Sequence, residues 1–370
     1  MKGEDLLFLD YPNTRLRPDE RLRYSALGLE AVPFESVGIL TPPRRGEPET
    51  ILATGTRQVG VKPYFWTIAE FCSQQLLPFL FADEEDQRQQ YMTVVHSVAA
   101  QLVLCAEKST EADGSVRIGS NVVRCFSELV GAIEEQLLPD GKPDHRWAGR
   151  AIGASTIQAF QRRLYASERH VEHLIRADTR DVPERAIDLG SHQVTVVDIH
   201  ELHDRAKHFV VGAVLRRAFE DREQSSVGRP LLFVVLDELN RFAPRDSNNP
   251  IKEVLLDVAE WGRALGIVLI GAQQTASEVE HRVVANSAIR VVGRLDSAEA
   301  REEQCGFLPG VQRRRATILR PGFVFLAQPR VPVPLLVEFP FPAWATRPAE
   351  ADLSEATSAS VPAEPYGRLK

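Results

Sequence analysis

In this 370-residue chain, Leu231-Leu-Phe-Val-Val-Leu-Asp237-Glu238 is the strongest indication of the fold, because an unbroken apolar run ends there in two carboxylates. A run without polar alternation is typical of a strand that is buried on both faces, as in a parallel sheet. A second run of this kind, Ile-Val-Leu-Ile, occupies residues 267–270, and residues 250–265 between the two runs have apolar residues at helical spacing. Strand, helix and strand in this order predict an α/β fold with a parallel sheet.

Asp237 and Glu238 follow the first run directly, which is the Walker B arrangement of nucleotide-hydrolysing enzymes. The strand would hold both carboxylates at the carboxyl edge of the sheet, where such folds bind ligands. Asp237 is the expected Mg²⁺ ligand, directly or through water, and Glu238 is expected to orient and deprotonate an attacking water. The alternative is a core strand that simply ends in an acidic turn, and these eight residues alone favour neither interpretation.

Further polar residues follow at positions that suit the same chemistry. Gln273 lies at the tip of the next strand, where its amide could contact a γ-phosphate or the attacking water. Arg263 ends the helix between the strands, and Arg290 and Arg294 flank the strand expected at 289–292. A guanidinium that a neighbouring subunit supplies would stabilise transition-state charge, although a surface salt bridge is the simpler explanation for Arg290 and Arg294.

Composition divides the chain into four parts. They are the start of the core with an irregular segment (1–63), a mainly helical insertion (64–180), the main α/β core (181–346) and a Pro-, Ala- and Ser-rich tail expected to be disordered (347–370). Further strands are expected at 6–9, 37–40, 51–53 and 194–197. Residues 316–319 and 323–326, joined by a turn at Pro321-Gly322, predict a C-terminal β-hairpin.

The overall composition narrows the class of protein. The net charge of −7 argues against a generally basic surface, although a ring-shaped motor can keep a few cations in its channel. The four cysteines show no CxxC spacing, no apolar run approaches the roughly 20 residues of a membrane span, and the amino terminus has no signal-peptide pattern. A cytoplasmic location is therefore expected. The spacing of His200, His203 and His208 matches no common zinc pattern.

The order of the motifs resembles the HerA-type branch of the HerA/FtsK superfamily of P-loop DNA translocases. Three stretches carry the resemblance: LLFVVLDELNRFAP (231–244), AEWGRALGIVLIGAQQTASEV (259–279) and NSAIRVVGRLDSAEA (286–300). The resemblance covers about residues 190–340 and, more weakly, the first ten residues. It implies a RecA-like P-loop NTPase sheet with a mainly helical insertion and a C-terminal β-hairpin.

The same resemblance implies roles for individual residues. These are Asp237 as the Mg²⁺ ligand, Glu238 as the catalytic carboxylate, Gln273 as the sensor glutamine, Arg263 as the arginine finger with Arg290 as second choice, and Glu4, in Gly3-Glu4, as an acidic member of the site. It further implies ATP and Mg²⁺ as cofactors, double-stranded DNA as substrate, a homo-hexameric ring and a possible partner nuclease. The activity implied is ATP hydrolysis coupled to DNA translocation or unwinding.

The phosphate-binding loop of such an enzyme is missing from the sequence. The loop needs G-x-x-x-x-G-K-[ST], so that backbone N–H groups and a lysine hold the phosphates. In Gly55–Lys62 the lysine comes one residue late and Pro63 follows it, and Gly149–Thr156 has no lysine. We therefore expect an N-terminally truncated chain that is inactive alone, with the strand, loop and helix encoded before Met1. The alternative is a non-catalytic structural or regulatory subunit of an ATPase ring.

Overall fold

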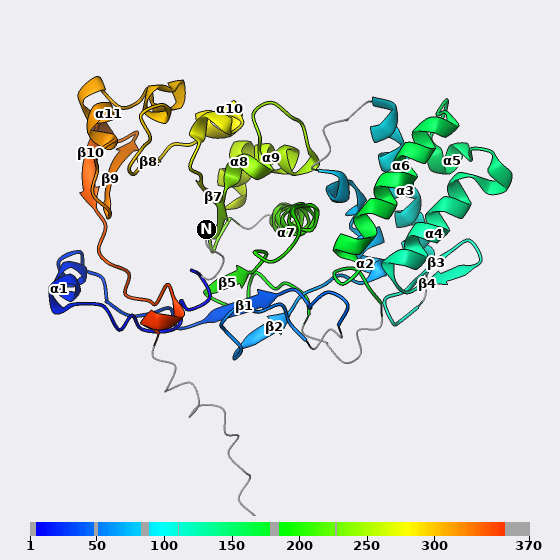
Figure 1. Cartoon of the computed structure of the whole chain (residues 1–370), viewed down its shortest axis with the longest axis horizontal. Coiled ribbons are helices and arrows are strands. Elements are labelled where there is room, and N and C mark those ends of the chain that lie inside the picture. The colour runs from blue at the N-terminus through cyan, green and yellow to red at the C-terminus, as the bar shows by residue number, and fades with distance from the viewer. Residues whose placement is uncertain are drawn as a thin grey trace, which may run out of the picture.

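The computed structural model describes residues 5–47, 51–82, 89–109, 111–177, 185–225 and 228–351. The expected site residue Glu4 lies outside these ranges, as do residues 352–370 of the expected tail. Figure 1 shows three regions side by side: a helical region at one end, a central region with parallel strands, and an antiparallel sheet at the other end. In the described part, no helix is long and apolar enough to cross a membrane.

The helical region confirms the mainly helical insertion. It contains α2 (Ile68–Ser73), the 3₁₀ helix η1 (Leu77–Phe81), α3 (Gln89–Lys108), α4 (Phe126–Leu137), the 3₁₀ helix η2 (Pro139–Gly141), α5 (His145–Ala148) and α6 (Ala154–Val171), with a small hairpin of β3 (Val116–Ile118) and β4 (Asn121–Val123). Helix α2 begins with a capping box, in which the Thr67 and Glu70 side chains each accept a hydrogen bond from the other's backbone N–H. Phe71, Phe126 and Phe160 are fully buried in its core.

The first parallel sheet has the order β2-β1-β5 and consists of β1 (Val37–Thr41), β2 (Val61–Pro63) and β5 (Val194–Val197). The strands expected at 37–40 and 194–197 are confirmed. The strand expected at 6–9 is wrong: these residues form turns, and Leu7, Phe8 and Leu9 are buried against β1 and β5 without pairing as a strand. Residues 51–53 contribute only an isolated bridge between Leu52 and Pro43.

The second parallel unit is the pair of β6 (Leu232–Asp237) and β7 (Ile267–Ala272), which are joined by α8 (Leu239–Phe242) and α9 (Pro250–Leu265). Helix α9 begins where Asn249 accepts a hydrogen bond from the Lys252 N–H at 2.7 Å, and it ends at Gly266 in a left-handed conformation. Helix α7 (Asp204–Ser225) packs against α9. The α/β fold class is confirmed, although the described parallel strands form two separate sheets.

The antiparallel sheet at the other end has the order β10-β9-β8. Its strands are β8 (Arg290–Val292), β9 (Phe323–Gln328) and β10 (Val331–Glu338), and the helices nearby are η3 (Ala276–Glu278), α10 (His281–Ala285), η4 (Glu299–Arg301), η5 (Glu303–Cys305) and α11 (Gly310–Ala316). The C-terminal hairpin is thus present, but its strands are β9 and β10. Residues 316–319 do not form a strand, because Ala316 ends α11 and is buried beside Phe325.

The remaining elements join the first and the last parts of the described chain. Helix α1 (Pro18–Ala26) presents Tyr24, whose hydroxyl donates to the Phe341 carbonyl at 2.9 Å. The 3₁₀ helix η6 (Pro348–Glu350) lies where the disordered tail was expected to begin, so that boundary is wrong. Glu350 is buried there and accepts hydrogen bonds from Thr346 and Asn13.

We predict that Gly266→Ala destabilises the chain by about 2 kcal/mol or more. Gly266 has φ +70°, which disfavours any side chain, and an added Cβ would lie 2.2 Å from the Gly228 carbonyl oxygen. The control is Gly131→Ala inside α4, where no atom lies within 4 Å of the added Cβ, and which should be neutral or stabilising by up to about 1 kcal/mol. Urea unfolding monitored by circular dichroism measures both, and equal effects would contradict the packing described.

Candidate active site

Asp237 and Glu238 lie at the tip of β6, beside the tip of β7. The parallel register pairs Asp237 with Ala272, so Gln273 follows one residue later on the neighbouring strand. The structure thus brings the two predicted carboxylates and the predicted amide to the same edge of the sheet. This is the carboxyl edge, where α/β folds bind their ligands.

Glu238 has a left-handed backbone conformation, with φ 55° and ψ 46°. Non-glycine residues rarely adopt this conformation, and where they do it is often at a functional site. Here it turns the chain sharply from β6 into α8. The turn packs closely on β7, because a Cβ at Gly271 would lie 2.3 Å from the Leu239 side chain. The carboxylates are therefore fixed on a rigid strand-to-helix turn.

Gln273 has an unsatisfied polar atom at this edge. Its side-chain oxygen is buried, and no described residue donates a hydrogen bond to it. An unpaired buried acceptor costs about 1–3 kcal/mol, so the position suits a residue whose partner comes with a ligand. Asp237 and Glu238 also fit Mg²⁺, which usually takes one or two protein carboxylates and completes its shell with water and phosphate oxygens. Within the described ranges no cluster of three acidic, His or Cys side chains offers another metal site.

Arg263 lies at the opposite edge of the sheet. It occupies the last turn of α9, directly before β7 begins, and the six residues of β7 separate it from Gln273 by roughly 20 Å. This distance exceeds the length of any side chain. Arg263 can therefore act on a carboxyl edge only if that edge belongs to another copy of the chain.

Arg290, the second candidate finger, is held by its own chain. Its guanidinium donates to the Val284 carbonyl at 3.2 Å and lies over the Phe307 ring at 5.6 Å. By contrast, no hydrogen bond or ion pair engages the Arg263 side chain among the residues that the structure describes. These contacts favour Arg263 over Arg290 as a residue that reaches a neighbour.

Glu278 also belongs to the site region, although no motif in the sequence points to it. Its carboxylate accepts hydrogen bonds from the Thr275 hydroxyl at 2.9 Å and from the Asn240 amide at 3.1 Å. It thereby ties α8, which follows the two catalytic candidates, to the segment after β7. A hollow of about 1070 Å³ opens beside this network, and Asp246 and Glu302 also line it.

A buried lysine fixes the loop between α8 and α9. The Lys252 ammonium donates to the Ser247 carbonyl at 2.9 Å and to the Arg245 carbonyl at 3.3 Å. It also forms an ion pair with Glu280, the residue directly before α10. The hydrogen bond from Lys252 lowers the pKa of the Glu280 carboxyl. This clamp holds the loop that lines the hollow.

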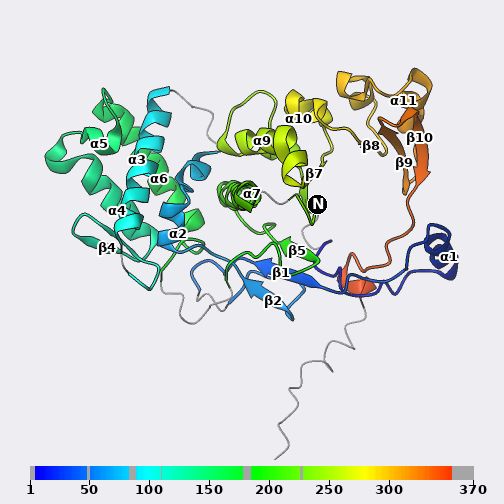
Figure 2. The same ribbon diagram turned by 180° about the vertical axis from the view of Figure 1, so that it is seen from behind.

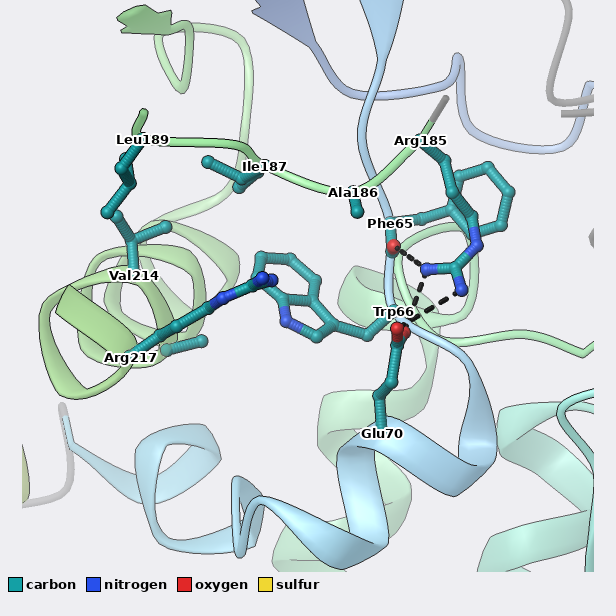
Figure 3. A pocket seen from close by; sticks show the side chains of 10 residues that line it. Phe65, Trp66, Glu70, Arg185, Ala186, Ile187, Leu189, Val214 and Arg217 are labelled. Atoms are coloured by element: carbon teal, nitrogen blue, oxygen red, sulfur yellow. Dashed lines mark hydrogen bonds and ion pairs between the residues drawn. The ribbon is translucent and has the colours of Figure 1, made fainter. Parts of the chain in front are cut away.

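A small cavity at the start of the helical region is structural (Figure 3). Arg185 lies over the Phe65 ring at 5.4 Å and donates to the Phe65 carbonyl and to both oxygens of Glu70. The cavity that remains beside Trp66 has a volume of about 10 Å³, which is room for about one water molecule. This arrangement anchors the start of the helical region to the segment that returns to the core, and it has no space for a nucleotide.

The histidines near α7 contact other side chains and carbonyls of the chain. The His200 imidazole contacts Asp198 at 2.9 Å, and His203 stacks on His170 at 3.7 Å between ring centroids. His208 contacts the Asp204 and Arg241 carbonyls.

One face of the β6–β7 pair is bare, which is unusual for parallel strands. Val234, Leu236 and Leu269 pack against the main core, which includes residues of α7 and α9. On the other face, Phe233, Val235 and Ile270 are 57%, 61% and 47% exposed. In Figure 2, as in Figure 1, α7 and α9 lie together on one side of these strands. Both faces of these strands are apolar, as in a sheet that helices cover on both sides, but the described helices cover only one face.

Comparison with known proteins identifies the fold. No family model and no curated protein matches the sequence. The unbound bacterial conjugative coupling protein TrwB is 12% identical over 85% of this chain and 77% of its own, with a TM-score of 0.50. The plasmid coupling protein TrwB in complex with ADP and Mg²⁺ is 11% identical over 80% and 76%, also with a TM-score of 0.50. VirB4 of Thermoanaerobacter pseudethanolicus is 15% identical over 75% and 69%, with a TM-score of 0.49.

At these identities the likeness to TrwB shows the fold alone. The chain has the RecA-like α/β fold of P-loop NTPases, which confirms the fold class implied by the resemblance to the HerA/FtsK superfamily. The roles of individual residues stay predictions.

We predict that Val235→Thr changes the free energy of unfolding of this chain by less than about 0.5 kcal/mol, because Val235 is exposed. Val234→Thr, its neighbour on the packed face, should cost about 1–2 kcal/mol, because it places a hydroxyl against the core. The two substitutions are isosteric, so they form a matched pair in urea unfolding. Equal costs would mean that both faces are covered.

We predict that Lys252→Met destabilises the chain by about 3 kcal/mol, because it leaves the Glu280 carboxylate without its cation. A carboxyl whose pKa is lowered by folding stabilises the native state above its unfolded pKa, and this contribution is lost as the pH falls through the lowered value. The unfolding free energy of Lys252→Met should therefore fall less steeply on acidification than that of the unaltered chain. The control is the double substitution Lys252→Met/Glu280→Gln, which should lower the unfolding free energy less than Lys252→Met alone. If the unfolding free energies of Lys252→Met and of the unaltered chain fall equally with pH, Lys252 does not stabilise the Glu280 carboxylate.

Proposed function

We propose that this chain carries the hydrolytic half of an ATP-driven motor of the HerA/FtsK type, which couples ATP hydrolysis to DNA translocation or unwinding. The observation that carries the proposal is the shared tip of β6 and β7, where Asp237, Glu238 and Gln273 meet on a P-loop NTPase fold. The complex of TrwB with ADP and Mg²⁺ supports a nucleotide as the ligand.

Each residue of the edge has a role in this proposal. Bound Mg²⁺ would neutralise charge on the phosphates, and Asp237 is the residue that holds it. Glu238 accepts a proton from the attacking water and orients that water toward the γ-phosphate. Gln273 donates from its amide to the γ-phosphate or positions the water through its unpaired oxygen. Arg263 of another copy stabilises the charge that develops in the transition state.

The chain supplies only part of the site in this proposal. Its 370 residues contain no G-x-x-x-x-G-K-[ST] loop to hold the phosphates. The bare apolar face of β6 and β7 supports a further polypeptide segment that packs there, because parallel strands are normally covered on both faces. We infer that this segment brings the phosphate-binding loop to the carboxyl edge.

Double-stranded DNA as the substrate, a homo-hexameric ring, a partner nuclease and a cytoplasmic location remain part of the proposal through the sequence resemblance. A non-catalytic structural or regulatory subunit of an ATPase ring is the second candidate, and the missing phosphate loop favours it. The two differ in one respect: only the first requires that the Glu238 carboxylate be needed for turnover.

Nucleotide binding tests the division of the site. We predict that the 370-residue chain alone does not saturate with MgATP below about 1 mM, because it lacks the backbone cradle for the phosphates. A titration with a fluorescent ATP analogue measures this. Micromolar binding by the chain alone would show that a complete phosphate site exists among these residues.

Substitution of the carboxylate tests the catalytic role. In an assembly of this chain that hydrolyses ATP, Glu238→Gln should lower kcat by at least about 100-fold and leave ATP binding within about threefold, because only the proton acceptor is lost. Glu30→Gln, which alters an exposed carboxylate far along the chain from the site, is the control. Full turnover by Glu238→Gln would reject the motor and favour the non-catalytic subunit.

A further inference from the structure

Histidines and arginines gather where the end of α6 meets the start of α7. The His170 and His203 rings are stacked, with 3.7 Å between their centroids and 17° between their planes. Arg169 donates from Nε to His170 Nε2 at 2.9 Å, and the Arg205 backbone N–H donates to His203 Nδ1 at 3.3 Å. Each ring thus accepts a hydrogen bond at one nitrogen, so its other nitrogen carries the hydrogen. The stacked pair therefore offers N–H donors to a ligand.

A third imidazole, that of His173, belongs to the same cluster. The residue is only 9% exposed, and no described residue forms a hydrogen bond with its Nδ1. Burial, followed by neighbouring positive charges that include Arg45, lowers the pKa of both His173 and His170 to about 4. A buried polar atom without a partner, among charges that disfavour protonation, indicates a place for a ligand of negative charge.

The cluster brings together more positive than negative charge. Arg45 follows β1, Arg169 lies in the last turn of α6, and Arg205 lies in the first turn of α7. Glu172 supplies a carboxylate, which forms an ion pair with Arg45 at 3.8 Å. The carboxylate of Asp204, also at the start of α7, is engaged by other cations. The three guanidiniums therefore outnumber the carboxylate with which they share the cluster, and a doubly charged anion would balance the excess.

We propose that this cluster binds a small, doubly charged oxyanion of the sulfate or hydrogen-phosphate type. The anion accepts hydrogen bonds from the imidazole N–H groups of His170, His173 and His203, and the guanidiniums of Arg45 and Arg205 supply the charge-assisted contacts. Bound there, it joins the segment after β1, the end of the helical insertion and the start of α7. The proposal uses no residue of the β6–β7 edge, so it does not rest on the ATPase assignment.

Binding of the anion is coupled to protonation of the imidazoles. A bound anion offsets the neighbouring cations, so the pKa of His170 and His173 should rise from about 4 toward the ordinary histidine value of about 6.5. Binding is therefore tighter at pH 5.5 than at pH 8, by about tenfold for each imidazole that regains an ordinary pKa. Sulfate is doubly charged at both pH values, so this change in its affinity reports protonation of the protein.

Titration with sulfate tests the proposal on the 370-residue chain. Isothermal titration calorimetry is performed at pH 5.5 and pH 8, with sodium chloride holding the ionic strength constant. The unaltered chain should bind one sulfate saturably, at least about tenfold more tightly at pH 5.5. Arg45→Gln should weaken binding by at least about tenfold at both pH values, because a charge-assisted contact is lost. Arg45 is exposed, so this substitution should leave the fold intact.

A neighbouring arginine and a second histidine variant complete the test. Arg44→Gln alters the exposed residue next to Arg45, and it should leave sulfate binding unchanged. His170→Phe keeps an aromatic ring on His203 but cannot take up a proton, so it should reduce the ratio of the affinities at pH 5.5 and pH 8.

Four results would overturn the proposal. They are heats that do not saturate, equal binding by Arg45→Gln and Arg44→Gln, equal affinity at the two pH values, and binding of a duplex oligonucleotide but not of sulfate. The last result would identify a nucleic-acid backbone, which carries one charge on each phosphate, as the ligand. Since the assay contains no nucleotide, failure of the ATPase assignment would leave all of these results unchanged.

Discussion

The parallel pairing of β6 with β7 determines where the candidate site residues lie. Its register sets Asp237 beside Ala272 and thereby places Glu238 and Gln273 at one edge. The left-handed turn at Glu238 and the close packing of Leu239 on Gly271 make that edge rigid. The same pairing sends Arg263 to the other edge, so the chemistry proposed for this site requires more than one copy of the chain.

The strand pair also has two unlike faces. Its packed face is covered by α7 and α9, while Phe233, Val235 and Ile270 remain open to solvent. Exposing such side chains is unfavourable by roughly 25 cal/mol for each Å² that could be buried, so a covering segment would be stabilised on this face. In the proposed function, one segment would supply both the cover for this face and the phosphate-binding loop.

Long apolar runs and caps made much of the fold predictable from the sequence. The apolar run at 231–236 and the helical spacing at 250–265 predicted β6 and α9 to within a residue or two. The apolar run at 6–9 does not form a strand, because Leu7, Phe8 and Leu9 are buried without pairing. Residues 316–319 do not form one either, because helix α11 extends to Ala316. The role of Glu278 could not be predicted from the sequence, because it depends on hydrogen bonds from Asn240 and Thr275 that form only in the folded chain.

The solvent accessibility of the exposed β6–β7 face differs between a chain without a covering segment and an assembly that contains one. Hydroxyl-radical labelling followed by mass spectrometry measures the accessibility of the Phe233 side chain, with the buried Phe209 as an internal standard. We expect strong labelling of Phe233 in the 370-residue chain alone and protection in an assembly that is hydrolysing ATP. Phe233 that is labelled equally in the hydrolysing assembly would contradict the claim that a covering segment completes the site.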